Sequence, residues 1–546
     1  MLQKNTIDTY REKCMRKTKI SKTMWILLGL TALGCALRVI SCFWGYPYSM
    51  HGDEPTIVGG AMDMLRRHSY EAEMYYRPDH FEIKCVALLY QIASYLCFGV
   101  PAYEAFAEHM GGFYAIARLY TAFWGVLMIP LSYAVLEKCK KGSGLIGAAL
   151  VAFYPIFVTH SAYATPDIVL TFFVMLIAYI SILYLERPSV WKLVGISACI
   201  GISITIKYTG AISCAWLAAI VIYERVKRKK YWHILAYGLL CIAVVILVSF
   251  AIGPNLYTNY TTTISTFIHE ARDTHLGSDG LNMWGNFKYY LDVFLNAMGV
   301  ESIVFMLLGI VYMVRKHTVA LMNLGLGLLF WVCTSCLGLH WERWGIPFYI
   351  FMLMFVVVGF SWIMDILGKI ANARVQKISK LVVNLVMLLI FGNVVFSGLW
   401  VARFSTLEES RVQGKTFCIE HGVTGDNTVY DGYSPLQMNG STTIPIGIDK
   451  DGNIMMPSGK EKAKFFIVSS GMYNRFYAEA ERYVNEVAMY EAIDDTCDLI
   501  YESEVFAARS SKWSAVNMVY KIGDIITSSG KCTGPIIKIY SIPWNN

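Results

Sequence analysis

Long apolar runs alternate with short polar segments along the chain as far as about residue 401. A run of about 20 apolar residues is long enough to cross a bilayer as a helix. The pattern predicts eleven such spans, at residues 24–43, 113–136, 144–161, 168–185, 190–206, 209–223, 232–252, 297–314, 318–337, 345–366 and 381–401. We therefore expect a polytopic α-helical membrane protein.

Residues 81–100 resemble a further span but are interrupted by Glu82, Lys84 and Gln91. Counting this segment as a span would turn the basic clusters at 138–141 and 225–230 toward the outer face, against the positive-inside rule. We expect it to lie in or on the outer interface as a partly buried helix. Without it, 23 of the 47 Lys and Arg residues fall on cytoplasmic segments.

This topology places the chain ends and the long loops. Residues 1–23 form a basic cytoplasmic tail, because a full span follows them with no small-residue cleavage site. Residues 24–401 form the membrane domain, whose outer loops are 44–112, 162–167 and 253–296. Since long outer loops alternate with short basic inner loops, we expect the chemistry at the outer face of the plasma membrane.

The sequence changes character after Arg403, where hydropathy falls and Gly, Ser and Asp turns appear. An amphipathic helical pattern covers residues 472–493. Short β-type runs surround it, at residues 427–433, 464–470, 497–503 and 536–542. Residues 402–546 are therefore predicted to form a separate extracytoplasmic α/β domain.

Composition supports a membrane protein and excludes several enzyme classes. Charged residues make up 16% of the chain, against about 25% in soluble domains, and the mean hydropathy is +0.45. The net charge of +7 reflects the cytoplasmic loops, so it does not indicate nucleic-acid binding. The chain has no Walker A loop, no GxSxG, no HExxH and no Cys/His zinc motif.

Asp53 and Glu54 follow the first span directly. Carboxylates are costly near hydrocarbon, so their presence suggests function. A simpler interpretation is that Asp53 caps a helix whose first turn contains Glu54 and Pro55, although capping and catalysis are compatible. Asp167, after Pro166 at the start of another span, is open to the same two interpretations. Both aspartates are expected at outer helix ends, where packing can bring them together.

Five cations are expected at the same membrane depth. Each alone is typical of a side chain that extends from the interface toward water. Together they suit a lipid phosphate, because arginine can bind phosphate oxygens bidentately. They are Arg77, Arg118, Lys207, Arg272 and Arg343.

The order and spacing of these residues resemble the lipid-carrier-dependent glycosyltransferases of the GT-C superfamily. The nearest branch is that of the protein O-mannosyltransferases and aminoarabinose transferases, glycosyltransferase family 39. The resemblance rests on Asp53-Glu54, Arg77-Pro78, Arg118-Leu119, Tyr154-Pro155, Ala164-Thr165-Pro166-Asp167, Lys207-Tyr208-Thr209-Gly210, Pro254-Asn255 and Glu270-Ala271-Arg272. One departure is Asp79, which stands where the family has a second proline after its His-Pro or Lys-Pro element.

The resemblance implies a GT-C fold and a role for each matching residue. Asp53 would be the catalytic base, with Glu54 beside it in the family's acidic pair. Asp167 would line the acceptor side. The carrier phosphate would be held by Arg118, Arg77, Arg272 and Lys207.

The implied reaction is inverting transfer of a hexose or pentose from a polyprenyl-phosphate to the hydroxyl of a protein, lipid or cell-envelope glycan. No cofactor is required by the branch, and a divalent cation between Asp53 and Asp167 is left open. The expected partners are the lipid-linked donor, the acceptor and membrane lipids, with no nucleic acid. The alternative is a transporter or flippase of an envelope precursor, which would favour charged or broken segments at mid-membrane.

Overall fold

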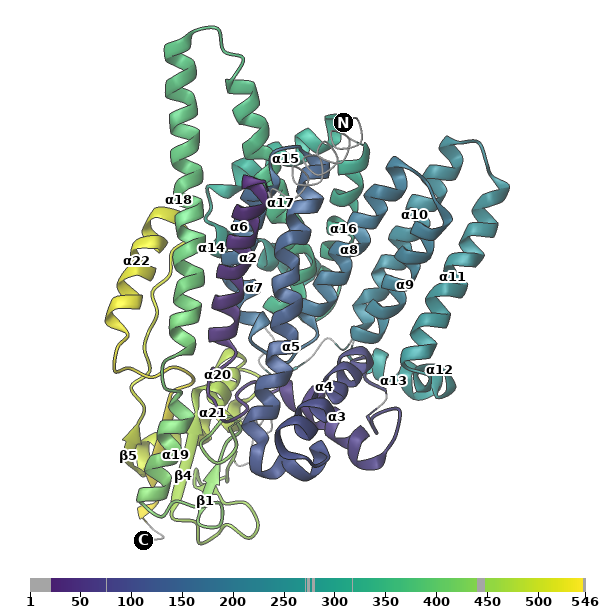
Figure 1. The fold of residues 1–546 in the computed structure, drawn as a ribbon. Helices are drawn as coiled ribbons and strands as arrows, with labels where there is room; N and C mark the ends of the chain where they lie inside the picture. Colours follow the sequence, from purple (N-terminus) through teal and green to yellow (C-terminus); the bar gives the residue numbers. More distant parts are fainter. Residues whose placement is uncertain are drawn as a thin grey trace, which may run out of the picture.

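The computed structural model describes residues 21–74, 76–270, 272, 275–276, 280–316, 318–438 and 447–543. Most of the predicted cytoplasmic tail, residues 1–20, lies outside this described part. The protein is a bundle of long helices with a small mixed domain at one end (Figure 1).

The helices of the bundle cover all eleven predicted spans. They are α2 (Lys22–Ser41), α5 (Ala102–Cys139), α6 (Gly144–Phe153), α7 (Pro155–Ser161), α8 (Asp167–Glu186), α9 (Val190–Ile206), α10 (Ile212–Lys227), α11 (Trp232–Ile252), α15 (Ser302–Lys316), α16 (Thr318–Ser335), α17 (Ile346–Leu367) and α18 (Ala373–Ser405). Within the described residues, eight helices are long and apolar enough to cross a membrane, or up to ten if each bent pair forms one span. The membrane fold is confirmed. Helix α9 and the described apolar part of α16 are shorter and are not among these ten, whereas the helix at His80–Phe98 is.

Shorter helices connect the spans. They are α3 (Glu54–Arg67), α4 (His80–Phe98), the 3₁₀ turn η1 (Tyr208–Ala211), α12 (Asn255–Thr258), α13 (Tyr260–Glu270), α14 (Met283–Met298) and the 3₁₀ turn η2 (Glu342–Gly345). Helix α4 covers the segment that we expect at the interface, yet it is one of the eight helices that meet the length and composition criterion. Figure 1 shows α3 and α4 at the end of the molecule where the mixed domain lies. Together with the start of α5 they have their own apolar core, which includes Val58, Tyr90 and Phe113. The interfacial position of α4 stays a prediction.

A proline and a buried arginine shape the span at 144–161. Pro155 separates α6 from α7, which are bent by 55°. Because Pro155 has no N–H, the carbonyl of Val151 loses its helical donor. Arg38 of α2 donates to this carbonyl and to that of Ala152, each at 3.0 Å. The arginine therefore satisfies backbone groups that the break exposes inside the bundle.

Helices α15 and α17 cross with backbones in close contact. Gly309 and Gly359 face each other at the crossing, and a Cβ atom on Gly359 would overlap the carbonyl oxygen of Phe305. Small residues at such crossings let membrane helices approach closely.

Replacing Gly359 by leucine should therefore destabilise the bundle by about 1–3 kcal/mol, since the clash is with backbone that cannot rotate away. The measurement is the free energy of unfolding in mixed SDS micelles. Gly29→Leu in α2 is the matched control, because nothing lies within 4 Å of its Cβ position. Equal stability of the two variants would contradict this packing.

The C-terminal domain contains a four-stranded sheet in the order β1-β4-β6-β5, with β1 and β4 parallel and the other pairs antiparallel. Its strands β1 (Thr428–Tyr430), β4 (Phe465–Ser469), β5 (Asp498–Glu502) and β6 (Ile537–Ser541) confirm the four predicted runs. A separate hairpin joins β2 (Gly447–Ile448) to β3 (Ile454–Met455), and α19 (Ser410–Glu420) precedes β1. The α/β class of the domain is confirmed.

Two features of this domain differ from the sequence pattern. The helix predicted at 472–493 is two helices, α20 (Ser470–Ala478) and α21 (Val484–Thr496). The turn between them lets the ring of Phe476 pack on Tyr483 and Tyr490, with centroids 5.3 and 5.8 Å apart. The last helix, α22 (Ser514–Thr527), returns to the bundle and lies along α18 (Figure 1). Its Asn517 donates to Asn393 of α18 at 2.7 Å.

Candidate functional site

Glu54 and Arg118 form a fully buried ion pair at the end of the bundle that faces the C-terminal domain. The two carboxylate oxygens of Glu54 accept from Nε and Nη2 of Arg118 at 2.7 and 2.8 Å. Glu54 also accepts from the hydroxyl of Ser49 and from the backbone N–H of Ala164, each at 3.2 Å. The pair thus joins α3, α5 and both loops in which Asp53 and Asp167 were predicted.

All five N–H donors of Arg118 are used within the protein. Besides Glu54, the guanidinium donates to three carbonyls of the loop after α2, those of Cys42, Trp44 and Tyr48, at 2.8–3.3 Å. Its side chain is 1% exposed. This geometry makes Arg118 a structural group that shapes the loop before Asp53, and it leaves no donor for the lipid phosphate that the sequence assigned to it.

Asp53 occupies the N-cap position of α3, but its side chain makes no capping hydrogen bond. Its Oδ2 instead lies 2.5 Å from Nη1 of Arg343, in the η2 turn before α17. The Asp53 side chain is 37% exposed and that of Arg343 is 27% exposed. The backbone N–H of Asp53 donates to Nδ1 of His51 at 3.2 Å. Asp53 is therefore fixed in place by its neighbours while its carboxylate stays accessible.

Several charges act on the carboxyl of Asp53. Burial raises its pKa, but Arg343, and after it His51, Arg77 and Lys207, lower the pKa by more, so that it lies below its usual range. Burial lowers the pKa of His51, although Asp53 opposes this. Asp53 is thus ionised at neutral pH and surrounded by cations.

Asp167 and Lys207 form a second ion pair on the same side of the bundle. Nζ of Lys207, between α9 and η1, lies 2.6 Å from Oδ1 of Asp167, the first residue of α8. Oδ2 of Asp167 is buried and has no hydrogen-bond partner among the described residues. Arg77 pairs with Asp79 at 3.2 Å, and burial raises the pKa of Asp79 although Arg77 opposes this. Each carboxylate of this set is matched to its own cation.

The arrangement bears on the question of a divalent cation. Within the described part of the chain, no group of three or more His, Cys, Asp or Glu side chains is placed to hold a metal ion. Asp53 is paired with Arg343, and Asp167 is paired with Lys207.

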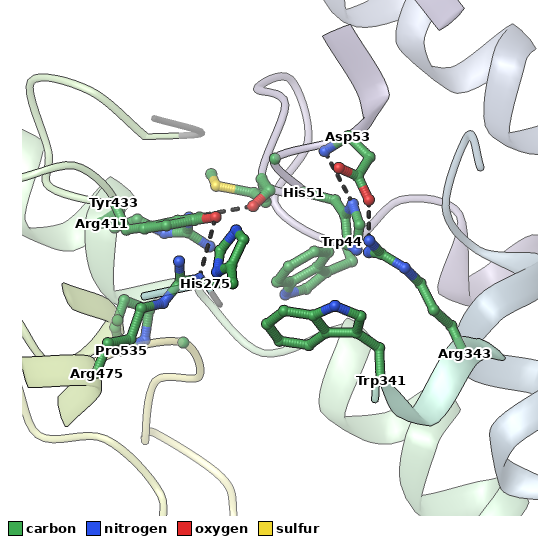
Figure 2. Close-up of a pocket in the computed structure, with 14 residues that line it drawn as sticks. Trp44, His51, Asp53, His275, Trp341, Arg343, Arg411, Tyr433, Arg475 and Pro535 are labelled. Atoms are coloured by element: carbon green, nitrogen blue, oxygen red, sulfur yellow. Dashed lines mark hydrogen bonds and ion pairs between the residues drawn. The ribbon is translucent and has the colours of Figure 1, made fainter. Parts of the chain in front are cut away.

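A cavity of about 480 Å³ opens beside Asp53, between the bundle and the C-terminal domain (Figure 2). Its size falls in the range of about 300–1,000 Å³ that is typical of small-ligand sites. Asp53 is the single carboxylate among the described residues that line it. They are Trp44, Met50, His51, Gly52, Asp53, His275, Trp341, Arg343, Arg411, Tyr433, Gly471, Arg475, Gly534 and Pro535.

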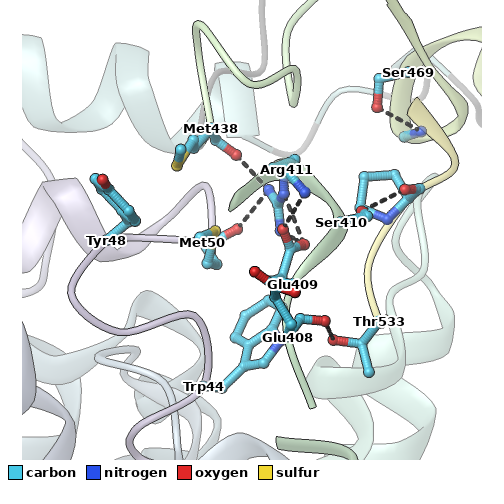
Figure 3. A network of polar contacts seen from close by, with 12 residues as sticks. Trp44, Tyr48, Met50, Glu408, Glu409, Ser410, Arg411, Met438, Ser469 and Thr533 are labelled. Carbon is cyan, nitrogen blue, oxygen red and sulfur yellow. Dashed lines mark hydrogen bonds and ion pairs between the residues drawn. The ribbon is translucent and has the colours of Figure 1, made fainter. Parts of the chain in front are cut away.

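Arg411 of α19 holds the C-terminal domain against the loop that carries Asp53 (Figure 3). Its buried guanidinium pairs with Glu409 at 2.5 Å. It also donates to the carbonyl of Met50, three residues before Asp53, at 3.1 Å, and to the carbonyl of Met438 in the C-terminal domain. The cavity therefore has walls from both domains, and one side chain ties them together.

The structure brings most of the sequence-derived candidates together. Arg77 and Lys207 act electrostatically on Asp53, and Asp167 holds Lys207. Arg272 lies after α13, where its Nη1 donates to the carbonyl of His269, so its role stays a prediction.

Sequence reasoning missed other lining residues. Arg343 belongs to the outer cations that suit a lipid phosphate, but the sequence does not indicate its pairing with Asp53. His51, two residues before Asp53, carries no signal in the sequence that marks it as part of the site. Trp341, Tyr433 and Arg475 carry no sequence signal, because only the docking of the C-terminal domain places them near Asp53.

Comparison with known proteins confirms the resemblance seen in the sequence. Residues 108–251 match the model of the family described as dolichyl-phosphate-mannose-protein mannosyltransferase. No curated protein matches the chain. One similar solved structure is the archaeal oligosaccharyltransferase AglB from Archaeoglobus fulgidus in complex with an inhibitory peptide and a dolichol-phosphate. It matches with a TM-score of 0.54 at 10% sequence identity, over 95% of this chain and 88% of AglB. ArnT from Cupriavidus metallidurans in the apo state matches with a TM-score of 0.50 at 13% identity, over 94% and 97%. The protein has the GT-C fold.

Glu54→Ala should destabilise the protein by about 3–5 kcal/mol, because it leaves the charge of Arg118 buried without a partner. The measurement is again unfolding in mixed SDS micelles. Asp63→Ala is the control: Asp63 pairs with Arg67 in the same segment, but both side chains are partly exposed, and such pairs contribute about 0–1 kcal/mol. If both variants lose the same stability, the Glu54–Arg118 pair does not hold this region together.

Proposed function

We propose that this protein transfers a sugar from a polyprenyl-phosphate carrier to an acceptor hydroxyl, at the outer membrane face and with inversion. The observation that carries the proposal is the position of Asp53 at the wall of the cavity. Its carboxylate is ionised and held by Arg343, and no other described residue that lines the cavity has a carboxylate. The GT-C fold supports the same reaction class, and AglB, which shares the fold, has been solved with a dolichol-phosphate.

Asp53 acts as the general base. Its carboxylate takes the proton of the acceptor hydroxyl while that oxygen attacks the anomeric carbon. The bond from this carbon to the carrier phosphate breaks, and the phosphate leaves with the electron pair. A single displacement of this kind inverts the anomeric centre. The ion pair with Arg343 orients Asp53 and keeps it ionised.

Arg77 and Lys207 are the cations that stabilise the leaving phosphate. Both act on Asp53, and their side chains are 39% and 20% exposed, so that a ligand can reach them. Asp167 positions Lys207 through their 2.6 Å contact. Charge that develops on the phosphate oxygens is thus met by positive groups already in place. Arg272 remains a candidate for the same role.

Asp53→Asn should reduce sugar transfer at least about 100-fold, because an amide cannot accept the hydroxyl proton. The assay supplies a radiolabelled polyprenyl-phosphate sugar to the purified protein and to membranes that contain acceptors. Asp365→Asn is the matched control, since Asp365 also pairs with a cation at 2.5 Å, Lys140, but far from the cavity. Undiminished transfer by a folded Asp53→Asn protein overturns the proposal, and undiminished export of a lipid or solute by it favours a transporter.

The pH dependence of transfer should depend on Arg343. The base works when ionised, so kcat/KM falls only as the pH drops through the lowered pKa of Asp53. Arg343→Gln removes the strongest cationic influence and leaves the effect of burial, which raises the pKa. The acid limb of the kcat/KM profile should then move to higher pH. Arg67→Gln, which removes an exposed ion pair in the same loop, should leave it in place, and an unmoved limb in Arg343→Gln contradicts the assignment.

A further inference from the structure

We infer that the cavity wall supplied by the C-terminal domain is the acceptor subsite, and that it takes a saccharide bearing an anionic group, a phosphate or a carboxylate. This inference rests on the proposed function and specifies its second substrate. It is carried by three features of the cavity: its charge balance, its aromatic faces and the conformation of Tyr433.

Among the described residues, one arginine of the cavity has no carboxylate partner. Three arginines line it, and two of them are paired, Arg343 with Asp53 and Arg411 with Glu409. Arg475 has no ion pair with any described carboxylate. Its guanidinium lies 5.2 Å from the ring centroid of Tyr433, and its Nη2 donates to the Tyr433 hydroxyl at 3.5 Å. An anion is the complementary ligand for a partly buried arginine that has no described carboxylate partner.

The unpaired charge and the base lie at opposite ends of the cavity, with aromatic rings between them. Figure 2 shows Trp44 and Trp341 between the Asp53–Arg343 pair and the Arg475–Tyr433 pair. The ring of Trp341 also meets that of His275 edge-on at 5.5 Å. Flat apolar rings suit the C–H-bearing face of a sugar ring, and the polar groups at the ends then fix its orientation.

Tyr433 is held in an unusual backbone conformation where it supports Arg475. Its φ angle is +58°, a left-handed conformation that is rare for an aromatic residue and is often found at functional sites. Two neighbours accommodate it. Gly471 at the start of α20 leaves room, since a Cβ there would lie 3.3 Å from that of Tyr433. Asp431, two residues before Tyr433, is buried and accepts from the Tyr490 hydroxyl at 2.9 Å. This hydrogen bond anchors the segment that precedes Tyr433.

The direction of the reaction assigns this wall to the acceptor. In a single displacement the attacking oxygen and the leaving phosphate lie on opposite sides of the anomeric carbon. Arg77 and Lys207 do not line the cavity, whereas Asp53 both lines it and is influenced by them. The donor phosphate therefore belongs with Arg77 and Lys207, and the acceptor approaches Asp53 through the cavity.

Binding to the full-length protein tests the inference without any transfer. Equilibrium dialysis measures the dissociation constants of glucose, glucose 6-phosphate, glucuronic acid, inorganic phosphate and a short Ser/Thr peptide. The acidic sugars should bind at least about tenfold more tightly than glucose, as expected for a hydrogen-bonded charge. They should also bind more tightly than inorganic phosphate, which lacks the ring that the tryptophans contact. Equal binding of glucose and the acidic sugars, tightest binding of inorganic phosphate, or tightest binding of the peptide overturns the inference.

Arg475→Gln should remove the preference for acidic sugars and leave glucose binding unchanged. Arg482→Gln is the matched control, because Arg482 lies in the turn after α20, pairs with Glu479 and does not line the cavity. A preference that survives in Arg475→Gln overturns the inference.

Asp53→Asn separates this inference from the proposed function. It should retain the Arg475-dependent preference for acidic sugars while its sugar transfer falls at least about 100-fold. Normal transfer by Asp53→Asn together with an Arg475-dependent preference would overturn the catalytic role and retain the subsite.

Discussion

The buried ion pair of Glu54 and Arg118 is the constraint on which the site depends. An arginine and a glutamate inside a membrane protein are stable only when their hydrogen-bonding groups are satisfied. Arg118 meets this condition by binding Glu54 and three carbonyls of the loop after α2. Glu54 meets it by accepting as well from Ser49 and Ala164. The loop around Asp53 is thereby fixed from both sides.

Adjacent carboxylates consequently have different roles. The carboxylate of Glu54 is buried and bound to Arg118. The carboxylate of Asp53, one residue earlier, lies at the cavity and stays partly exposed. The same division occurs among the cations: Arg118 is enclosed, whereas Arg77, Lys207 and Arg343 remain partly accessible. Charge pairing inside the bundle thus determines which charged side chains stay accessible to a ligand.

The C-terminal domain completes the cavity rather than lying apart from it. Arg411 joins its α19 to the carbonyl of Met50, and α22 lies along α18 of the bundle. Residues separated by more than 350 positions, such as Asp53 and Arg411, therefore line one space. The domain borders the cavity beside Asp53, which is why we propose acceptor recognition there.

The sequence by itself determined the helical membrane fold, the four strands of the C-terminal domain and the segments that carry Asp53, Asp167, Arg77 and Lys207. These features follow from local signals, because hydropathy and residue order can be read directly from the sequence. Only the tertiary structure decided that Glu54 and Arg118 bind each other, that Arg343 is the partner of Asp53, and that Arg475 and Tyr433 face them across the cavity. Such pairings join distant residues, and they depend on how helices and domains pack, which no local pattern encodes.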